Sequence, residues 1–294
     1  MSPGAMVHCH TLLPLEKSSK YCSSESHKKM ILNWQDVALF GTPCGNCVSH
    51  APTPCRFGPG PHRVAMDVEY PKVQQTNSDA STWPRTRGTI ILEMAPLDLM
   101  PHVVNLFLQQ VHHRLWNSCT VVSSATHIFQ LAPSYKAEDA TGDGNVSDTT
   151  KTHYDHFRAK GLDKVSYQEY SAQYPHEQWT AGLAGRPGGP DFYLNKRNNT
   201  QIHGPGGQLN KHDLHNEADP CFGRLVEGHE ILTEIETVPT DPENNYALKY
   251  PVTIVEARVL VRKENHAEGW QAVPPGEKFD HGQILPLPDI PHGS

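Results

Sequence analysis

The sequence lacks an excess of positive charge and any long run of apolar residues. Its 294 residues carry 25 Lys and Arg against 32 Asp and Glu, a net charge of −7, which disfavours general binding to nucleic acid. No stretch approaches the ~18 apolar residues that a membrane span needs, and the N-terminal region lacks the apolar core of a signal peptide. We therefore expect a chain that is soluble as written, with no membrane span and no nucleic-acid partner.

Paired cysteines are also scarce. Five of the seven cysteines lie in the first 55 residues, and they contain one Cys-x-x-Cys pair, Cys44 and Cys47. A structural zinc site usually draws its four ligands from two such pairs, so the pattern favours free thiols over a metal site. Cys119 and Cys221 stand apart from the others, and we expect them to be buried as small hydrophobic residues.

Motifs for metal, nucleotide and covalent chemistry are missing as well. The 19 histidines include no His-Glu-x-x-His motif, and the chain has no P-loop, dinucleotide fingerprint or Gly-x-Ser-x-Gly turn. Residues 142–145 (GDGN) lack the spacing of a calcium loop, so we expect a surface loop there, within the polar stretch 137–171. His203, His212 and His215 fall in an irregular connection that favours a solvated loop over a metal site. We expect no cofactor.

Composition divides the chain into three parts. Residues 1–62 mix His, Ser, Pro, Gly and Cys without helical or strand periodicity, which predicts a disordered, flexible N-terminal arm. Residues 264–294 are rich in proline and predict a disordered C-terminal tail. Residues 63–263 carry regular hydrophobic patterns, so we expect the folded domain there.

The patterns within the domain predict many short strands and two helices. Helices are expected at about 100–112, with Pro101 in the first turn, and at 227–236. Strands are expected at 64–70, 89–94, within 118–131 as two strands or one bent strand, and at 179–184, 191–194, 221–225 and 252–261. Strands and helices do not alternate as in βαβ units, which favours an antiparallel barrel or sandwich with helices at its ends.

Three segments, in this order, resemble the signature of a known family. The run GTIILEM from Gly88, followed by PHVVNLF from Pro101, is similar to a strand and helix of the cyclophilin-type peptidyl-prolyl cis-trans isomerases. GPDFYL from Gly189 and FGRLVEG from Phe222 resemble two further segments of that family. The resemblance implies a mainly β fold, a closed eight-stranded antiparallel cyclophilin-like barrel capped by two α-helices. It also implies cis/trans isomerisation of X-Pro bonds, which requires no cofactor because the barrier is amide resonance.

The family's site residues carry over only in part. In the family an Arg donates a hydrogen bond to the twisted prolyl amide and a Gln assists it; Gln130 matches that Gln, but Val122 falls on the Arg and Val121 on the preceding His. Further peptide-binding positions implied by the resemblance are Ile128, Phe129, Ala184, Asp191, Phe192 and Tyr193. Loss of one preorganised donor slows other enzymes by about 100 to 1,000-fold. We therefore expect proline-peptide binding with weak or absent isomerase activity.

Two alternatives stay open. One is an active isomerase with a substitute donor, for which Arg114 and Arg186 are the candidates. The other is a non-catalytic scaffold whose contacts come from the arm or the tail. In every case we expect a monomer, and the expected partners are Pro-containing peptides or protein segments. The compartment stays open, because the glycosylation sequons at Asn145 and Asn198 matter only in the secretory pathway.

Overall fold

The computed structural model describes residues 7–8, 21–22, 56–58, 60–73, 83–134, 148–207, 217–262 and 269–275. The chain forms two compact units, Met1–His50 and Ala51–Ser294. In the first unit, β1 (Val7–His8) pairs antiparallel with β2 (Tyr21–Cys22). Most of the predicted arm and tail lies outside the described residues, as do the Cys44–Cys47 pair, residues 142–145, and Asn145, His212 and His215.

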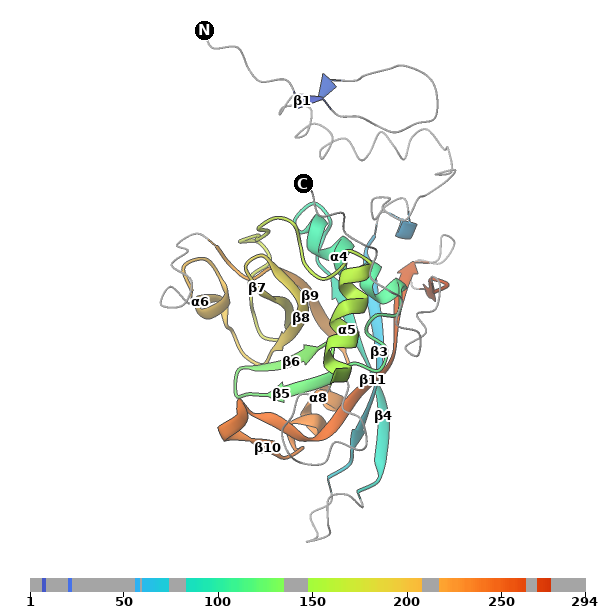
Figure 1. The fold of residues 1–294 in the computed structure, drawn as a ribbon, viewed down its shortest axis with the longest axis vertical. Helices are drawn as coiled ribbons and strands as arrows, with labels where there is room; N and C mark the ends of the chain where they lie inside the picture. Colours follow the sequence, from blue (N-terminus) through green and yellow to red (C-terminus); the bar gives the residue numbers. More distant parts are fainter. Residues whose placement is uncertain are drawn as a thin grey trace. The chain divides into compact units, whose positions relative to one another are not determined.

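Eight antiparallel strands of the second unit close into a barrel (Figure 1). They are joined in the order β11-β3-β4-β9-β7-β8-β6-β5, and β5 pairs back with β11 to complete the ring. The strands are β3 (His62–Pro71), β4 (Arg85–Met94), β5 (Thr120–Ser124), β6 (Ile128–Ala132), β7 (Thr180–Gly185), β8 (Gly188–Asn195), β9 (Cys221–Glu227) and β11 (Ala247–Arg262). The prediction of a closed eight-stranded antiparallel barrel is confirmed, and segment 118–131 forms two strands.

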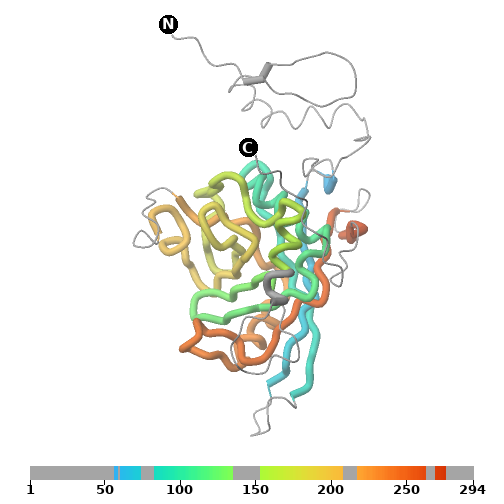
Figure 2. Tube along the Cα trace, viewed as in Figure 1, coloured from blue at the N-terminus to red at the C-terminus, as the bar shows by residue number. Residues whose placement is uncertain are grey.

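The long strand β11 closes the barrel. Its 16 residues pair with β3 and β5, and also with two short strands, β10 (Thr240–Asp241) and β12 (Trp270–Ala272). Figure 2 shows β3, β4 and β11 running beside one another. β12 lies within the segment predicted as a tail, and the Arg63 guanidinium sits 4.4 Å from the centre of the Trp270 ring. The sheet therefore continues beyond residue 263.

Both predicted helices are present. α4 (Pro101–His112) begins with a proline, whose missing N–H is not needed in the first turn. Its free backbone N–H groups at His102 and Val103 donate to the Glu169 carboxylate, at 3.0 and 2.6 Å. α8 (His229–Glu236) buries Ile231, Leu232 and Ile235 on one face. Two one-turn helices, α6 (Thr200–His203) and η2 (Pro242–Asn244), lie in the connections.

A further helix, α5 (Asp148–Ala159), lies in the polar stretch 137–171. The sequence patterns predicted no helix in that stretch, so α5 is an element that sequence analysis missed. Phe157 of α5 is fully buried, and its ring packs edge-on against Trp116 with 5.2 Å between centroids. The helix was missed because the stretch is strongly polar overall, so that few apolar residues mark its buried face.

Aromatic side chains fill the interior of the barrel. The centroid of the Phe107 ring lies 4.4 Å from that of Phe222, and the Trp116 centroid lies 4.8 Å from that of Phe192. Cys119 and Cys221 are buried free thiols, as predicted. Because side chains pack the interior, a peptide-sized site must lie on the outer surface. No helix among the described residues is long and apolar enough to cross a membrane.

Candidate functional site

Three neighbouring strands place several of the predicted site residues on one outer face of the barrel. Gln130 of β6 pairs with Tyr193 of β8, which in turn pairs with Gly182 of β7. Directly paired residues of antiparallel strands point to the same side of a sheet, and so do residues two positions apart on one strand. Ile128 and Asp191 therefore share this face with Gln130 and Tyr193.

The remaining predicted positions lie elsewhere. Phe192 belongs to the aromatic interior of the barrel. Phe129 also belongs to the core and is 1% exposed, although the Lys196 ammonium lies 4.0 Å from its ring centre. Ala184 is half-buried near the end of β7, where the pairing with β8 is irregular. The structure thus brings together Ile128, Gln130, Asp191 and Tyr193 and directs the two phenylalanines inward.

Val122 lies beside Gln130, at an irregularity in the pairing of β5 with β6. Val121 pairs with Leu131 and Ser123 pairs with Gln130, so β5 carries one extra residue between them. Val122 is therefore the extra residue of a β-bulge. Its side chain is half-buried and has no hydrogen-bond donor. A hydrocarbon side chain consequently occupies the position to which the resemblance assigns the catalytic guanidinium.

Gln130 is held in a hydrogen-bonded group with Asp191 and Tyr154. The Gln130 Nε2 donates to Asp191 Oδ2 at 3.4 Å, and the Tyr154 hydroxyl donates to Asp191 Oδ1 at 2.6 Å. Burial raises the pKa of Asp191, and these hydrogen bonds offset only part of the rise. Tyr154 belongs to α5, so the helix that sequence analysis missed supplies a polar contact to the predicted face.

The Tyr193 ring is enclosed by neighbouring groups and is 1% exposed. The centroid of the His203 ring lies 4.4 Å from the Tyr193 centroid, and that of His176 lies 6.0 Å away. A Cβ atom at Gly182 would lie 2.7 Å from Cζ and Oη of Tyr193, so only glycine leaves room for the ring there. The Tyr193 ring, which the resemblance assigns to peptide binding, is therefore covered by residues of this chain.

Asp219 connects the residues around Tyr193. Its Oδ2 accepts hydrogen bonds from Tyr193 Oη at 2.9 Å and from His203 Nδ1 at 2.7 Å, and its Oδ1 accepts one from Arg186 Nε at 3.0 Å. Burial alone would raise the pKa of Asp219, but hydrogen bonds from His203, Arg186 and Tyr193 outweigh it and lower that pKa. Burial and the nearby Asp219 carboxylate raise the pKa of Tyr193 well above its usual value. At neutral pH the cluster therefore consists of an ionised carboxylate and a neutral phenol.

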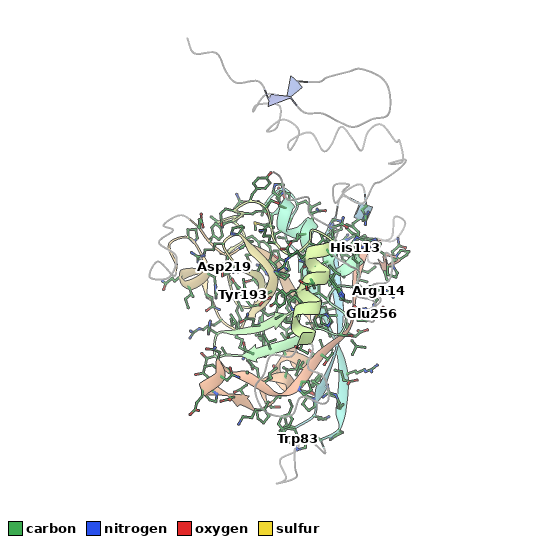
Figure 3. All side chains as sticks on the ribbon, viewed as in Figure 1. Trp83, His113, Arg114, Tyr193, Asp219 and Glu256 are labelled. Carbon is green, nitrogen blue, oxygen red and sulfur yellow. The ribbon has the colours of Figure 1, made fainter. Side chains whose placement is uncertain are left out.

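The two arginines considered as substitute donors are placed differently. The Arg186 side chain is 2% exposed and, besides Asp219, donates from Nη1 to the carbonyl oxygens of Gly207 and Glu217 at 2.7 and 2.9 Å. Arg114 follows α4 and lines a cavity of about 150 Å³ with β11, where Glu256 is a neighbour. Figure 3 shows Arg114 and Glu256 together, apart from Tyr193 and Asp219.

The described residues contain no group of three or more His, Cys, Asp or Glu side chains arranged to hold a metal ion. His176 Nε2 lies 2.8 Å from the carbonyl oxygen of Asp219, within hydrogen-bonding distance. Burial lowers the pKa of His176 to about 4. The imidazole is therefore neutral at pH 7 and, because a carbonyl oxygen only accepts, it donates from Nε2. The sequon residue Asn198 is exposed, in the turn that precedes α6.

Sequence reasoning missed most of the groups that cover this face. His203 was considered only as a possible metal ligand, and Asp219, His176 and Tyr154 were not predicted at all. These residues lie in connections or in α5, outside the strands whose periodicity can be recognised. Arg186, weighed as a catalytic donor, forms a buried ion pair instead. No local pattern in the sequence signals that these side chains meet.

Solved structures of other proteins are similar to this chain. Among solved structures, a cyclophilin type peptidyl-prolyl cis-trans isomerase from Cryptosporidium parvum is similar, with 13% identity and a TM-score of 0.43, over 69% of this chain and 98% of that one. The same protein in the presence of the dipeptide Ala-Pro is similar at 14% identity and a TM-score of 0.40, over 60% of this chain and 94% of that one. No curated protein sequence matches.

The family comparison is the decisive one. The family described as cyclophilin type peptidyl-prolyl cis-trans isomerase/CLD matches residues 81–259. That range begins just before β4 and reaches into β11, and it includes Val122, Gln130 and Tyr193. It covers more than half of the sequence and most strands of the barrel. This chain therefore belongs to the cyclophilin type peptidyl-prolyl cis-trans isomerase/CLD family.

Proposed function

We propose that the folded domain predicted at residues 63–263 is a binding module for Pro-containing segments with weak or absent isomerase activity. The observation that carries this proposal is Val122, which occupies the bulge opposite Gln130. Rotation about an X-Pro bond must overcome amide resonance, a barrier that is ~18–20 kcal/mol for peptide bonds in general. A donor that bonds to the twisted amide lowers that barrier, and valine has none to offer.

The placement of the arginines favours this proposal over an active isomerase. Arg186 is buried, and its donors are directed at Asp219 and at backbone carbonyl oxygens. Swinging it toward a substrate would leave the Asp219 carboxylate without its cationic partner, which costs several kcal/mol. Arg114 lines the cavity beside β11 and is not part of the Tyr193 cluster.

An isomerase assay on the full chain tests the proposal. The probe is a peptide containing Ala-Pro, the dipeptide present with the similar Cryptosporidium parvum protein, and exchange between its cis and trans forms is followed by NMR. We expect a rate constant at least about 100-fold below that of an active cyclophilin, as expected for the loss of one preorganised donor. A rate close to that of the active enzyme would refute the proposal.

A variant identifies where any residual activity arises. The Gln130→Ala variant lacks the side-chain amide that the resemblance assigns to the prolyl site. Because Gln130 is half-exposed, we expect this variant to stay folded. If residual isomerisation takes place at this face, the Gln130→Ala rate falls further. An unchanged residual rate would place that activity elsewhere on the protein or in a contaminant.

A further inference from the structure

We propose that residues 199–207 form an intramolecular plug that keeps Pro-containing peptides off Tyr193. The ring of His203 is the part of the plug that covers Tyr193, and Arg186 with Asp219 latches the segment in place. This inference rests on the proposed function, because it describes how access to the same face is controlled.

The His203 ring occupies the surface that a proline ring would need. Its centroid lies 4.4 Å from that of Tyr193, with 31° between the ring planes, and its Nδ1 is hydrogen-bonded to Asp219. The His203 ring also stacks on that of His127, with 6.3 Å between centroids, and its centroid lies 5.6 Å from that of His176. Imidazole and pyrrolidine are both five-membered rings of similar size. A proline ring therefore reaches Tyr193 only if His203 leaves.

Buried polar side chains hold the segment at both ends. At its start Asn199 is 1% exposed, and its Nδ2 donates to the His127 carbonyl oxygen at 2.9 Å and to Asn195 Oδ1 at 2.8 Å. At its end Arg186 Nη1 donates to the Gly207 carbonyl oxygen at 2.7 Å, while Nε pairs with Asp219. Hydrogen bonds of Asn199 at one end and of Arg186 at the other therefore fasten the plug to the barrel.

The plug is a thin layer rather than part of the hydrophobic core. Its helix, α6, has four residues, too few to be stable without tertiary contacts. Gln201 and Pro205 are exposed, and the Ile202 side chain is 37% exposed. When such a segment opens, water replaces most of its lost hydrogen bonds, so each bond contributes only a small part of its intrinsic strength to closure. The aromatic interior around Phe192 stays packed, and opening therefore need not unfold the barrel.

The plug lowers the apparent affinity for a peptide by the fraction of molecules that are open. If about 1% of molecules are open, the measured Kd is about 100-fold weaker than that of the open face. Removing the covering ring should therefore strengthen peptide binding. We expect at least a tenfold decrease in Kd, which corresponds to an open population below about 10% in the natural chain.

The test compares His203→Ala with the natural chain in titrations with the Ala-Pro peptide. Binding is followed by NMR of the full chain labelled at tyrosine, so that contact with Tyr193 is seen directly. The matched control is His229→Ala, the same chemical change on α8, where the ring packs edge-on against Trp179, 5.4 Å away. The inference predicts at least tenfold tighter binding for His203→Ala, with shifts at Tyr193, and unchanged binding for His229→Ala.

Equal Kd values for His203→Ala and the natural chain would overturn the inference, as would tighter binding without a response at Tyr193. If His203→Ala does not fold, judged by its circular dichroism, Asn199→Ala replaces it. That variant leaves the His203 ring in place but removes the anchor at the start of the segment, and the same two outcomes apply. The isomerisation rate is measured on the same samples. Rapid isomerisation by the natural chain would contradict the proposed function, whereas a variant with an unchanged Kd for the peptide would contradict the plug.

Discussion

Replacing Arg186 with methionine measures how strongly the buried ion pair stabilises the domain. Arg186 and Asp219 side chains are 2% and 6% exposed, and Nε lies 3.0 Å from Oδ1. Removing one partner of a buried pair costs about 3–5 kcal/mol, because a charge is left without compensation. Asp219 keeps its hydrogen bonds from Tyr193 and His203. We therefore expect a loss near the lower limit, about 3 kcal/mol of the free energy of unfolding.

Equilibrium unfolding in urea at pH 7 provides the measurement, followed by tryptophan fluorescence, to which the buried Trp116 contributes. For a domain of 150–250 residues, 1 kcal/mol corresponds to about 2–4 °C in Tm, so the variant should also melt about 6–12 °C lower. The control is Arg258→Met. Arg258 is 34% exposed and pairs with Asp67 and Glu256 at 2.8 and 2.7 Å, and exposed pairs contribute at most about 1 kcal/mol. Equal losses in the two variants would refute the assignment of Arg186 as a structural latch.

Two further predictions concern the neighbours of Tyr193. Burial lowers the pKa of His176 to about 4 from its usual 6.5. The contribution of neutral His176 to the free energy of unfolding is therefore complete above pH 6.5, and about 3 kcal/mol is lost as the pH falls toward 4. Between pH 7 and pH 4, urea unfolding should show a smaller loss of stability for His176→Gln than for the natural chain, and equal losses would contradict this pKa. In Gly182→Ala the new Cβ would lie 2.7 Å from Tyr193 and 2.9 Å from His176, so we expect a loss of about 1–3 kcal/mol from overpacking. The loss should shrink in a Tyr193→Leu background, and a double-mutant cycle without coupling would show that the two residues do not compete for space.

The barrel could be predicted from the sequence because its information is local. Alternating apolar residues mark β3, and an apolar run marks the second half of β4, where buried and half-buried residues alternate. Pro101 and the spacing of Val104, Phe107 and Leu108 mark α4. α5 could not be found in this way, since its buried face combines Phe157, which packs against the distant Trp116, with two polar residues, His153 and His156. A face that buries histidines is recognised from tertiary packing and not from a pattern of apolar residues.

The site residues on strands could likewise be predicted from the sequence, whereas those in the connections could not. Counting back from Gln130 predicts Val122 at the donor position, and the strand register then places these two residues side by side. The covering groups come from connections, and Asp219 meets Arg186 across 33 residues of sequence. The loop that folds back over Tyr193 is set by tertiary contacts between distant residues, which local composition does not reveal. A resemblance to a family likewise predicts a pocket, but not what fills it.

The closure of the ring by β11 has a consequence for biosynthesis. β3 leaves the ribosome long before its partner β11, which begins at Ala247, and Val68 pairs with Ile254. Until translation has passed that point, β3 and β5 each expose an unpaired edge capable of joining a strand of another nascent chain. Such distant pairing also makes folding slow. The β3 edge thus stays unpaired while some 180 further residues are synthesised, which is the interval in which aggregation competes with folding.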